Sequence, residues 1–150
     1  MLRIFIILIL FGCGKEDSHY INPTLNSYVQ NFLERANAHK RNTLSFANVL
    51  SIDFCYAEEN NRGICVVKEK TSKIKGTNIE VSKTINKYVC IDPEISEIPF
   101  DYVYVLYHEL GHCVFDENHN DVEGTLMFKT FQFDHDDPEV MLDDYFKSGL

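Results

Sequence analysis

Apolar residues recur every three or four positions in three parts of the chain, and this spacing predicts three amphipathic helices. The first is expected over residues 23–39, because Pro23 is favoured at the first position of a helix. The second is expected to begin at Pro99 or Phe100 and to carry an apolar face along its length. A short closing helix is expected over residues 137–146.

Alternating apolar and polar residues mark the middle of the chain and predict strands. The expected strands are a half-buried one at residues 50–56, a short apolar one at 64–67, and one at 85–91 that stops before Pro93. The polar stretch 68–77 is expected to be an exposed excursion. The middle of the chain is therefore expected to form a small sheet.

The order of these elements predicts an α+β fold in a single domain over residues 23–150: a backing helix, a small twisted mixed sheet, a central helix and a closing helix. The composition is 45% apolar with 11 Phe and 8 Tyr, which is enough for a hydrophobic core that does not need disulfides or a metal to be stable. The net charge of −9 argues against a nucleic-acid partner, because neutralising phosphates needs clustered Lys and Arg. A monomer is expected.

The N-terminal segment is expected to be an export signal outside the fold. Residues 1–12 hold an Arg and an unbroken apolar run, which is too short for a bilayer span of about 20 residues. The ending Leu-Phe-Gly-Cys resembles the lipobox of bacterial lipoproteins. The resemblance implies cleavage before Cys13, a lipid on its sulfur, a tether over residues 13–22, and anchoring in the bacterial cell envelope on the periplasmic or outer-surface side. A plain signal peptide and an uncleaved anchor are the alternatives.

Four further cysteines (Cys55, Cys65, Cys90 and Cys113) lack a CxxC spacing, which argues against a redox motif or a thiolate zinc site. An exported location permits disulfides, and three pairings are possible if all four cysteines are bridged. Cys55 and Cys65 flank a turn-like stretch and could face each other across a hairpin. Cys113 is interpreted as a buried free thiol, since Cys is a common small core residue.

The predicted central helix carries the sequence His108-Glu109-Leu110-Gly111-His112, which matches H-E-x-x-H. Residues four apart lie on the same face of a helix, so two imidazoles can reach one zinc ion at about 2.0–2.1 Å. Glu109 then lies beside the pair, where its carboxylate can act as general base for a water that the metal activates. Gly111 costs about 1 kcal/mol of helix stability, so we expect a close backbone or a bulky neighbour to pass over it.

A catalytic zinc needs a third protein ligand and an open fourth position. His119 is the preferred candidate, because it lies seven residues after His112 in a polar segment that leaves the helix, and imidazole suits zinc. His19 and His39 are interpreted as bystanders. The alternatives for the third ligand are Asp116, Asp121, Glu123 and His135.

The segment from His108 to Met127 (HELGHCVFDENHNDVEGTLM) resembles the metzincin clan of zinc peptidases, and most closely small bacterial lipoprotein metallopeptidases. The resemblance implies that His108, His112 and His119 bind zinc and that Glu109 is the base. It implies that Met127 lies in a Met-turn and forms a hydrophobic floor under the metal. It also implies that substrate lies extended along the edge strand of the sheet.

Two positions depart from the long metzincin signature. Phe115 stands where that signature has the Gly that ends the helix, and His119 follows one residue late. Because Phe adopts positive φ only at a cost, the turn is expected at residues 116–118 instead. Lys129 stands where some relatives carry a Tyr after Met127.

The predicted function is zinc-dependent hydrolysis of peptide bonds, with a peptide or protein substrate, in an exported and membrane-tethered lipoprotein. Specificity is expected to rest on a pocket near Phe128 and Phe131. One alternative is a zinc amidase that acts on cell-wall peptide. Another is a non-catalytic surface lipoprotein that binds a partner and holds a structural zinc.

Overall fold

The computed structural model describes residues 19–56, 61–130 and 137–148. Its helices are α1 (Asn26–Ala38), α2 (Pro99–Phe115) and α3 (Pro138–Lys147), with short 3-10 helices η1 (Leu44–Asn48) and η2 (Pro93–Ile95). Its strands are β1 (Tyr20–Ile21), β2 (Val49–Phe54), β3 (Gly63–Lys73) and β4 (Glu80–Ile91). The predicted α+β class and the three predicted helices are confirmed within this part of the chain.

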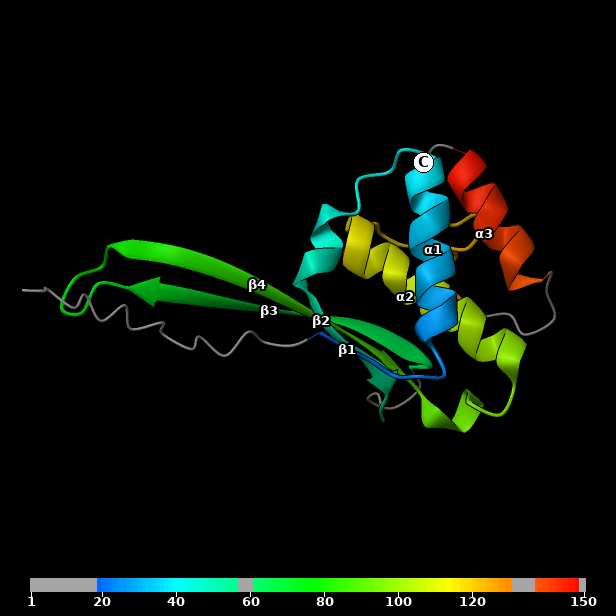
Figure 1. Ribbon diagram of the computed structural model, residues 1–150, viewed down its shortest axis with the longest axis horizontal. Coiled ribbons are helices and arrows are strands. Elements are labelled where there is room, and N and C mark those ends of the chain that lie inside the picture. The colour runs from blue at the N-terminus through cyan, green and yellow to red at the C-terminus, as the bar shows by residue number, and fades with distance from the viewer. Residues whose placement is uncertain (1–18, 57–60, 131–136, 149–150) are drawn as a thin grey trace, which may run out of the picture.

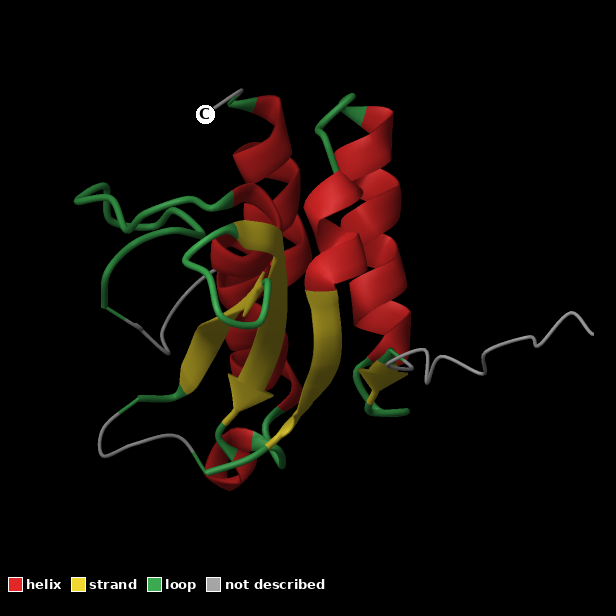
Figure 2. Ribbon diagram, turned by 90° about the vertical axis from the view of Figure 1, so that its left-hand side faces the viewer, coloured by secondary structure: helices red, strands yellow, loops and turns green. Residues whose placement is uncertain are grey.

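The four strands form one mixed sheet in the order β1-β2-β4-β3. Strands β1, β2 and β4 run parallel, and β3 pairs antiparallel with β4 at one edge. Lys87, Val89 and Ile91 alternate along β4 and are buried, which shows that this face of the sheet is covered. The helices are grouped on that side of the sheet (Figure 2).

Helix α2 lies in the middle of the fold, in contact with β3 and β4 as well as with α1 and α3. Phe32 of α1 is fully buried and joins the helices, because its ring packs against the rings of Tyr107, Phe115 and Phe146. Such aromatic pairs add to the free energy gained from burial alone. A helix enclosed in this way holds its side chains in fixed positions.

The stretch predicted as an exposed excursion is a two-stranded antiparallel arm. Its pairing continues from Lys68 opposite Asn86 to Lys73 opposite Glu80, and Gly76 occupies the turn with φ of 85°. Figure 1 shows the arm extending well beyond the helices. The predicted exposure is confirmed, since residues 68–77 are all exposed. The strand pairing was not predicted, because the arm has no buried face and its sequence therefore lacks an apolar alternation.

The start of the fold also differs from the sequence prediction. Tyr20 and Ile21, expected at the end of the tether, pair with β2 as β1. Helix α1 then begins later than expected because Asn22 closes a separate turn, in which its backbone oxygen accepts a hydrogen bond from Leu25. The predicted signal segment and Cys13 lie outside the described residues. In the described part of the chain, no helix combines the length and apolar character needed to cross a membrane.

Two disulfides correct the predictions made for the cysteines. Cys55 is joined to Cys90 and Cys65 to Cys113, with Cα atoms 5.4 and 5.6 Å apart. The hairpin pairing of Cys55 with Cys65 was wrong because β4 lies between the strands that carry them. The free thiol predicted at Cys113 was also wrong, since α2 packs directly on β3 and brings that sulfur to Cys65.

Candidate metal centre

The H-E-x-x-H motif lies in the last two turns of α2, at the centre of the molecule. His108 is 1% exposed and Glu109 is 4% exposed, so both polar side chains are buried in the core. Burial of this kind is costly unless the groups are paired or bind a ligand. The motif is therefore part of an enclosed site and not a solvated patch.

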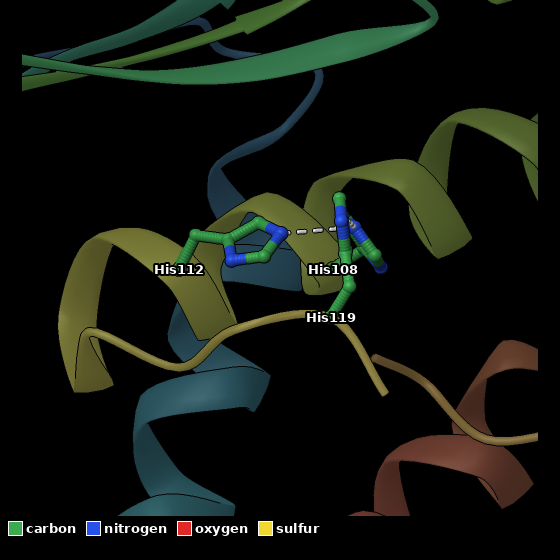
Figure 3. Close-up of side chains that lie close together, drawn as sticks. All are labelled: His108, His112 and His119. Atoms are coloured by element: carbon green, nitrogen blue, oxygen red, sulfur yellow. Dashed lines mark hydrogen bonds between the residues drawn. The ribbon is translucent and has the colours of Figure 1, made fainter. Parts of the chain in front are cut away.

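His119 comes from the loop after α2 and joins the two histidines of the helix (Figure 3). Its Nε2 atom lies 3.0 Å from Nε2 of His108, which in turn lies 3.1 Å from Nε2 of His112. Three nitrogens around a tetrahedral zinc at 2.0–2.1 Å would be roughly 3.3 Å apart. The three side chains therefore converge closely enough to hold one metal ion.

The tautomers of the two helical histidines favour a cation between them. Nδ1 of His108 donates a hydrogen bond to the backbone oxygen of Leu126 at 2.7 Å, and Nδ1 of His112 donates to that of Glu117. A carbonyl oxygen only accepts, so each neutral ring carries its proton on Nδ1 and presents a bare lone pair on Nε2. Two such lone pairs 3.1 Å apart repel each other, and a bound cation removes that repulsion.

The other candidates for the third ligand are paired with lysines, exposed away from the histidines, or outside the described residues. They were Asp116, Asp121, Glu123 and His135. Asp116 accepts a hydrogen bond from Lys87 at 2.6 Å, and Asp121 accepts one from Lys129 at 2.6 Å. Glu123 is exposed, and residue 135 is not described. Only His119, of the candidates described, is placed with the motif.

Gly111 and Met127 are packed against each other. A Cβ atom on Gly111 would lie 2.5 Å from Sδ of Met127, so the absence of a side chain makes room for the methionine. Met127 is 3% exposed and follows Leu126, whose carbonyl orients His108. The neighbour that the sequence predicted over Gly111 is therefore the methionine of the predicted Met-turn.

The chain leaves α2 through a turn at Asp116. This residue takes the left-handed conformation with φ of 55°, so the prediction that the turn falls after Phe115 is confirmed. Lys87 of β4, only 4% exposed, fixes the turn by donating to the carbonyl of Cys113 and to the side chain of Asp116, each at 2.6 Å. A cation near the last carbonyls also interacts favourably with the helix dipole. This role of Lys87 was not predictable from the sequence, because a single Lys in a strand carries no signal of burial.

Glu117 secures the loop that leads to His119. Its side chain accepts hydrogen bonds from Arg41 and from the hydroxyl of Tyr145, the latter at 2.6 Å. Its backbone oxygen accepts from His112, so the residue that orients one ligand is itself tied to two other elements. Arg41 in addition lies 4.5 Å over the ring of Phe115. These contacts hold the ligand-bearing loop against the helices.

Glu109 faces away from the core of helices and towards β3. Burial raises the pKa of its carboxyl to about 8, and a hydrogen bond from the backbone of Cys65 acts in the opposite direction. Burial also lowers the pKa of His108 to about 4, which keeps the ring neutral as metal binding requires. A carboxyl with a pKa near neutrality is suited to exchange protons.

A cleft of about 400 Å³ opens the site to solvent between α2 and the edge strand β3. Its lining includes Glu109, His112 and His119 on one side and Gly63, Ile64, Cys65 and Val67 of β3 on the other. Phe128, predicted near a specificity pocket, is half-buried, whereas Phe131 lies outside the described residues. The cleft therefore places the candidate base and ligands beside the exposed edge of a strand.

Gly63, in the turn-like stretch between Cys55 and Cys65, is a site residue that was not predicted from the sequence. A Cβ atom there would lie 2.4 Å from Cγ1 of Val105 and 2.9 Å from Cγ of Glu109. The first strand residue of β3 can thus approach α2 only because it has no side chain. No sequence signal distinguishes this glycine from a turn glycine.

We expect Gly63→Ala to lower the free energy of unfolding by about 1–3 kcal/mol, because the new methyl group overpacks the contact with α2. Denaturant unfolding measures the change. Val105→Ala removes the closest obstructing atom, so the double variant should lose less than the sum of the two single variants. Additive losses would show that the two side chains do not share this contact.

Comparisons with other proteins add no family or relative to this description. No family model matches the chain, no curated protein is significantly similar to it, and no solved structure matches its fold at a significant level. The function is therefore argued from the geometry of the three histidines, Glu109 and the cleft. These features support the binding of a metal ion, whose identity depends on the chemistry of the donors.

Proposed function

We propose that this chain is a metzincin-like zinc peptidase, held on a membrane of the cell envelope by a lipid on Cys13. The observation that carries the proposal is the convergence of His108, His112 and His119 beside the buried carboxyl of Glu109. Three neutral imidazoles form a donor set that suits zinc and leaves a fourth position for chemistry.

The residues around the cleft would have separate roles in hydrolysis. A zinc ion, when bound, would polarise the substrate carbonyl and lower the pKa of water. Glu109 accepts the proton of the attacking water and passes it to the leaving amine nitrogen. Leu126 and Glu117 keep the rings of His108 and His112 aimed at the ion through their backbone carbonyls.

The position of strand β3 is an argument for a peptide substrate. It is the edge strand of the sheet and lines the cleft opposite Glu109. An extended peptide can add to such an edge through backbone hydrogen bonds, with its side chains directed alternately to the cleft and to solvent. Met127, packed on Gly111 next to the ligands, would form the apolar floor of the centre.

Metal removal tests the proposal. We expect the purified chain to contain zinc by elemental analysis and to cleave unstructured peptides, such as a casein digest or a peptide library. A zinc chelator should abolish cleavage, and added zinc should restore it. Cleavage of cell-wall peptides alone would favour an amidase. A stably bound zinc with no hydrolysis of either substrate class would favour a structural metal and overturn the peptidase proposal.

A further inference from the structure

The β3–β4 arm, residues 68–86, has no role in the candidate metal centre. All of its residues up to Thr84 are exposed, and its two strands pair with each other from Lys68 opposite Asn86 to Lys73 opposite Glu80. Its charge is opposite to that of the chain: five lysines and two glutamates leave +3, whereas the whole chain carries −9. The lysines are Lys68, Lys70, Lys73, Lys75 and Lys83.

Three exposed apolar side chains flank the polar turn at the end of the arm. Ile74 is 47% exposed, Ile79 is 60% exposed and Val81 is 63% exposed. The backbone N–H of Ile74 donates to the oxygen of Ile79 at 3.0 Å, so the two isoleucines lie together at the tip. Lys73 and Lys75 flank Ile74 in the sequence. Exposed apolar side chains next to lysines suit the surface of an anionic bilayer, with the ammonium groups among the headgroups and the apolar groups just below them.

The topology places the tip on the same side of the sheet as the N-terminal end of β1. Strands β1, β2 and β4 are parallel and β4 begins in the arm, so β1 also begins at the end of the sheet from which the arm extends (Figure 1). Tyr20 pairs with Ser51 across β1 and β2, and Ser51 pairs with Tyr88 across β2 and β4, so the three residues lie in one row of the sheet. Along β4, the distance from Tyr88 to Ile79 at the tip is about 30 Å at the rise of a β-strand. Six residues lie between Cys13 and Tyr20, and the seven Cα–Cα steps that join the two residues span at most about 25 Å.

We propose that the tip of the β3–β4 arm binds the surface of a membrane that contains anionic phospholipid, with Ile74 and Ile79 in the interface and the arm lysines at the phosphates. A lipid on Cys13 and the arm tip would then make two contacts with one membrane. Two weak membrane contacts together hold a protein far better than either alone. Val67, the residue that precedes the arm in β3, lines the cleft, so this contact would orient the cleft relative to the bilayer.

The chain contains no Trp, so Ile79→Trp in the full-length chain gives a single fluorescent reporter at the tip. With vesicles of phosphatidylcholine and phosphatidylglycerol, we expect its emission to shift to shorter wavelength and to be quenched by brominated lipid. Val140→Trp, on α3 and 51% exposed, is the matched control and should show neither effect. Pure phosphatidylcholine vesicles should give a much weaker response.

Charge reversal in the arm distinguishes membrane binding by the tip from membrane binding by other parts of the chain. Lys70→Glu, Lys73→Glu and Lys75→Glu, added to Ile79→Trp, should weaken the tip response at least about tenfold, even where the chain still sediments with vesicles through its N-terminus. A tip reporter that ignores anionic vesicles, or that responds equally to neutral ones, would overturn the proposal. A response only to an acidic polypeptide would assign the arm to a protein partner instead. None of these results depends on zinc or hydrolysis, so the peptidase proposal is tested separately.

Discussion

Glu109→Gln is expected to reduce peptide hydrolysis by about 10²–10⁴-fold while leaving the zinc content unchanged. Glutamine has nearly the same shape as glutamate but does not accept a proton at neutral pH. The change leaves the three imidazoles and their backbone partners in place, because Glu109 is not one of the converging ligands. Initial rates on a fluorogenic peptide, together with elemental analysis of the same preparation, measure both effects.

The stability of this variant gives an independent readout. The folded-state pKa of Glu109, about 8, lies above the ordinary value of 4.5, so the folded protein is favoured while the carboxyl is protonated and loses stability as pH rises towards 8. Glutamine removes that cost. In the metal-free protein at pH 7.5 we therefore expect the free energy of unfolding to rise by on the order of 2 kcal/mol. A variant that loses both stability and zinc would indicate a structural role for Glu109.

The helices and the metal motif were predictable because their signals are local. The second helix begins at Pro99 as expected, and the four-residue spacing of His108 and His112 alone places both rings on one face. The turn at Asp116 followed from the steric cost of positive φ at Phe115. In each case the property that decides the structure belongs to a few neighbouring residues.

The features that the sequence did not reveal depend on which segments meet in space. The disulfide pairing follows from the insertion of β4 between β2 and β3, an order that periodicity does not encode. Gly63 is constrained by Val105 and Glu109, which lie far along the chain. Lys87 resembles the arm lysines in sequence, yet its ammonium group is buried against the end of α2. Such contacts become visible only with the tertiary fold.

These long-range contacts also explain why the centre can be preorganised in so small a domain. The Cys65–Cys113 disulfide ties the edge strand to α2 one residue after His112. Asn120 donates its backbone N–H to the oxygen of Met127 at 2.8 Å, which closes the loop that carries His119 onto the predicted Met-turn. The loop that supplies the third ligand is therefore held at both ends.

His119→Ala is expected to weaken zinc binding at least about 100-fold, since it removes one of three protein ligands and leaves two on one helix. Competition with a chromophoric zinc chelator measures the affinity. The midpoint of thermal unfolding should respond in parallel. Added zinc should raise the midpoint of the parent chain, because the stabilisation grows with the logarithm of the zinc concentration divided by Kd. The same zinc concentration should raise the midpoint of the variant less. The metal-free variant should unfold close to the metal-free parent, because His119 is largely exposed.

Two matched variants make the assignment of His119 specific. His39→Ala removes a histidine that stacks on Phe146, and it should retain the zinc affinity of the parent. Asp121→Ala removes a carboxylate that is paired with Lys129 two residues beyond His119, and it should retain that affinity as well. If Asp121→Ala loses zinc while His119→Ala keeps it, the loop must rearrange to present a carboxylate, and the three-histidine centre is wrong. Retention of zinc by both variants would instead leave Asp116, Glu123 and His135 as candidates for the third ligand.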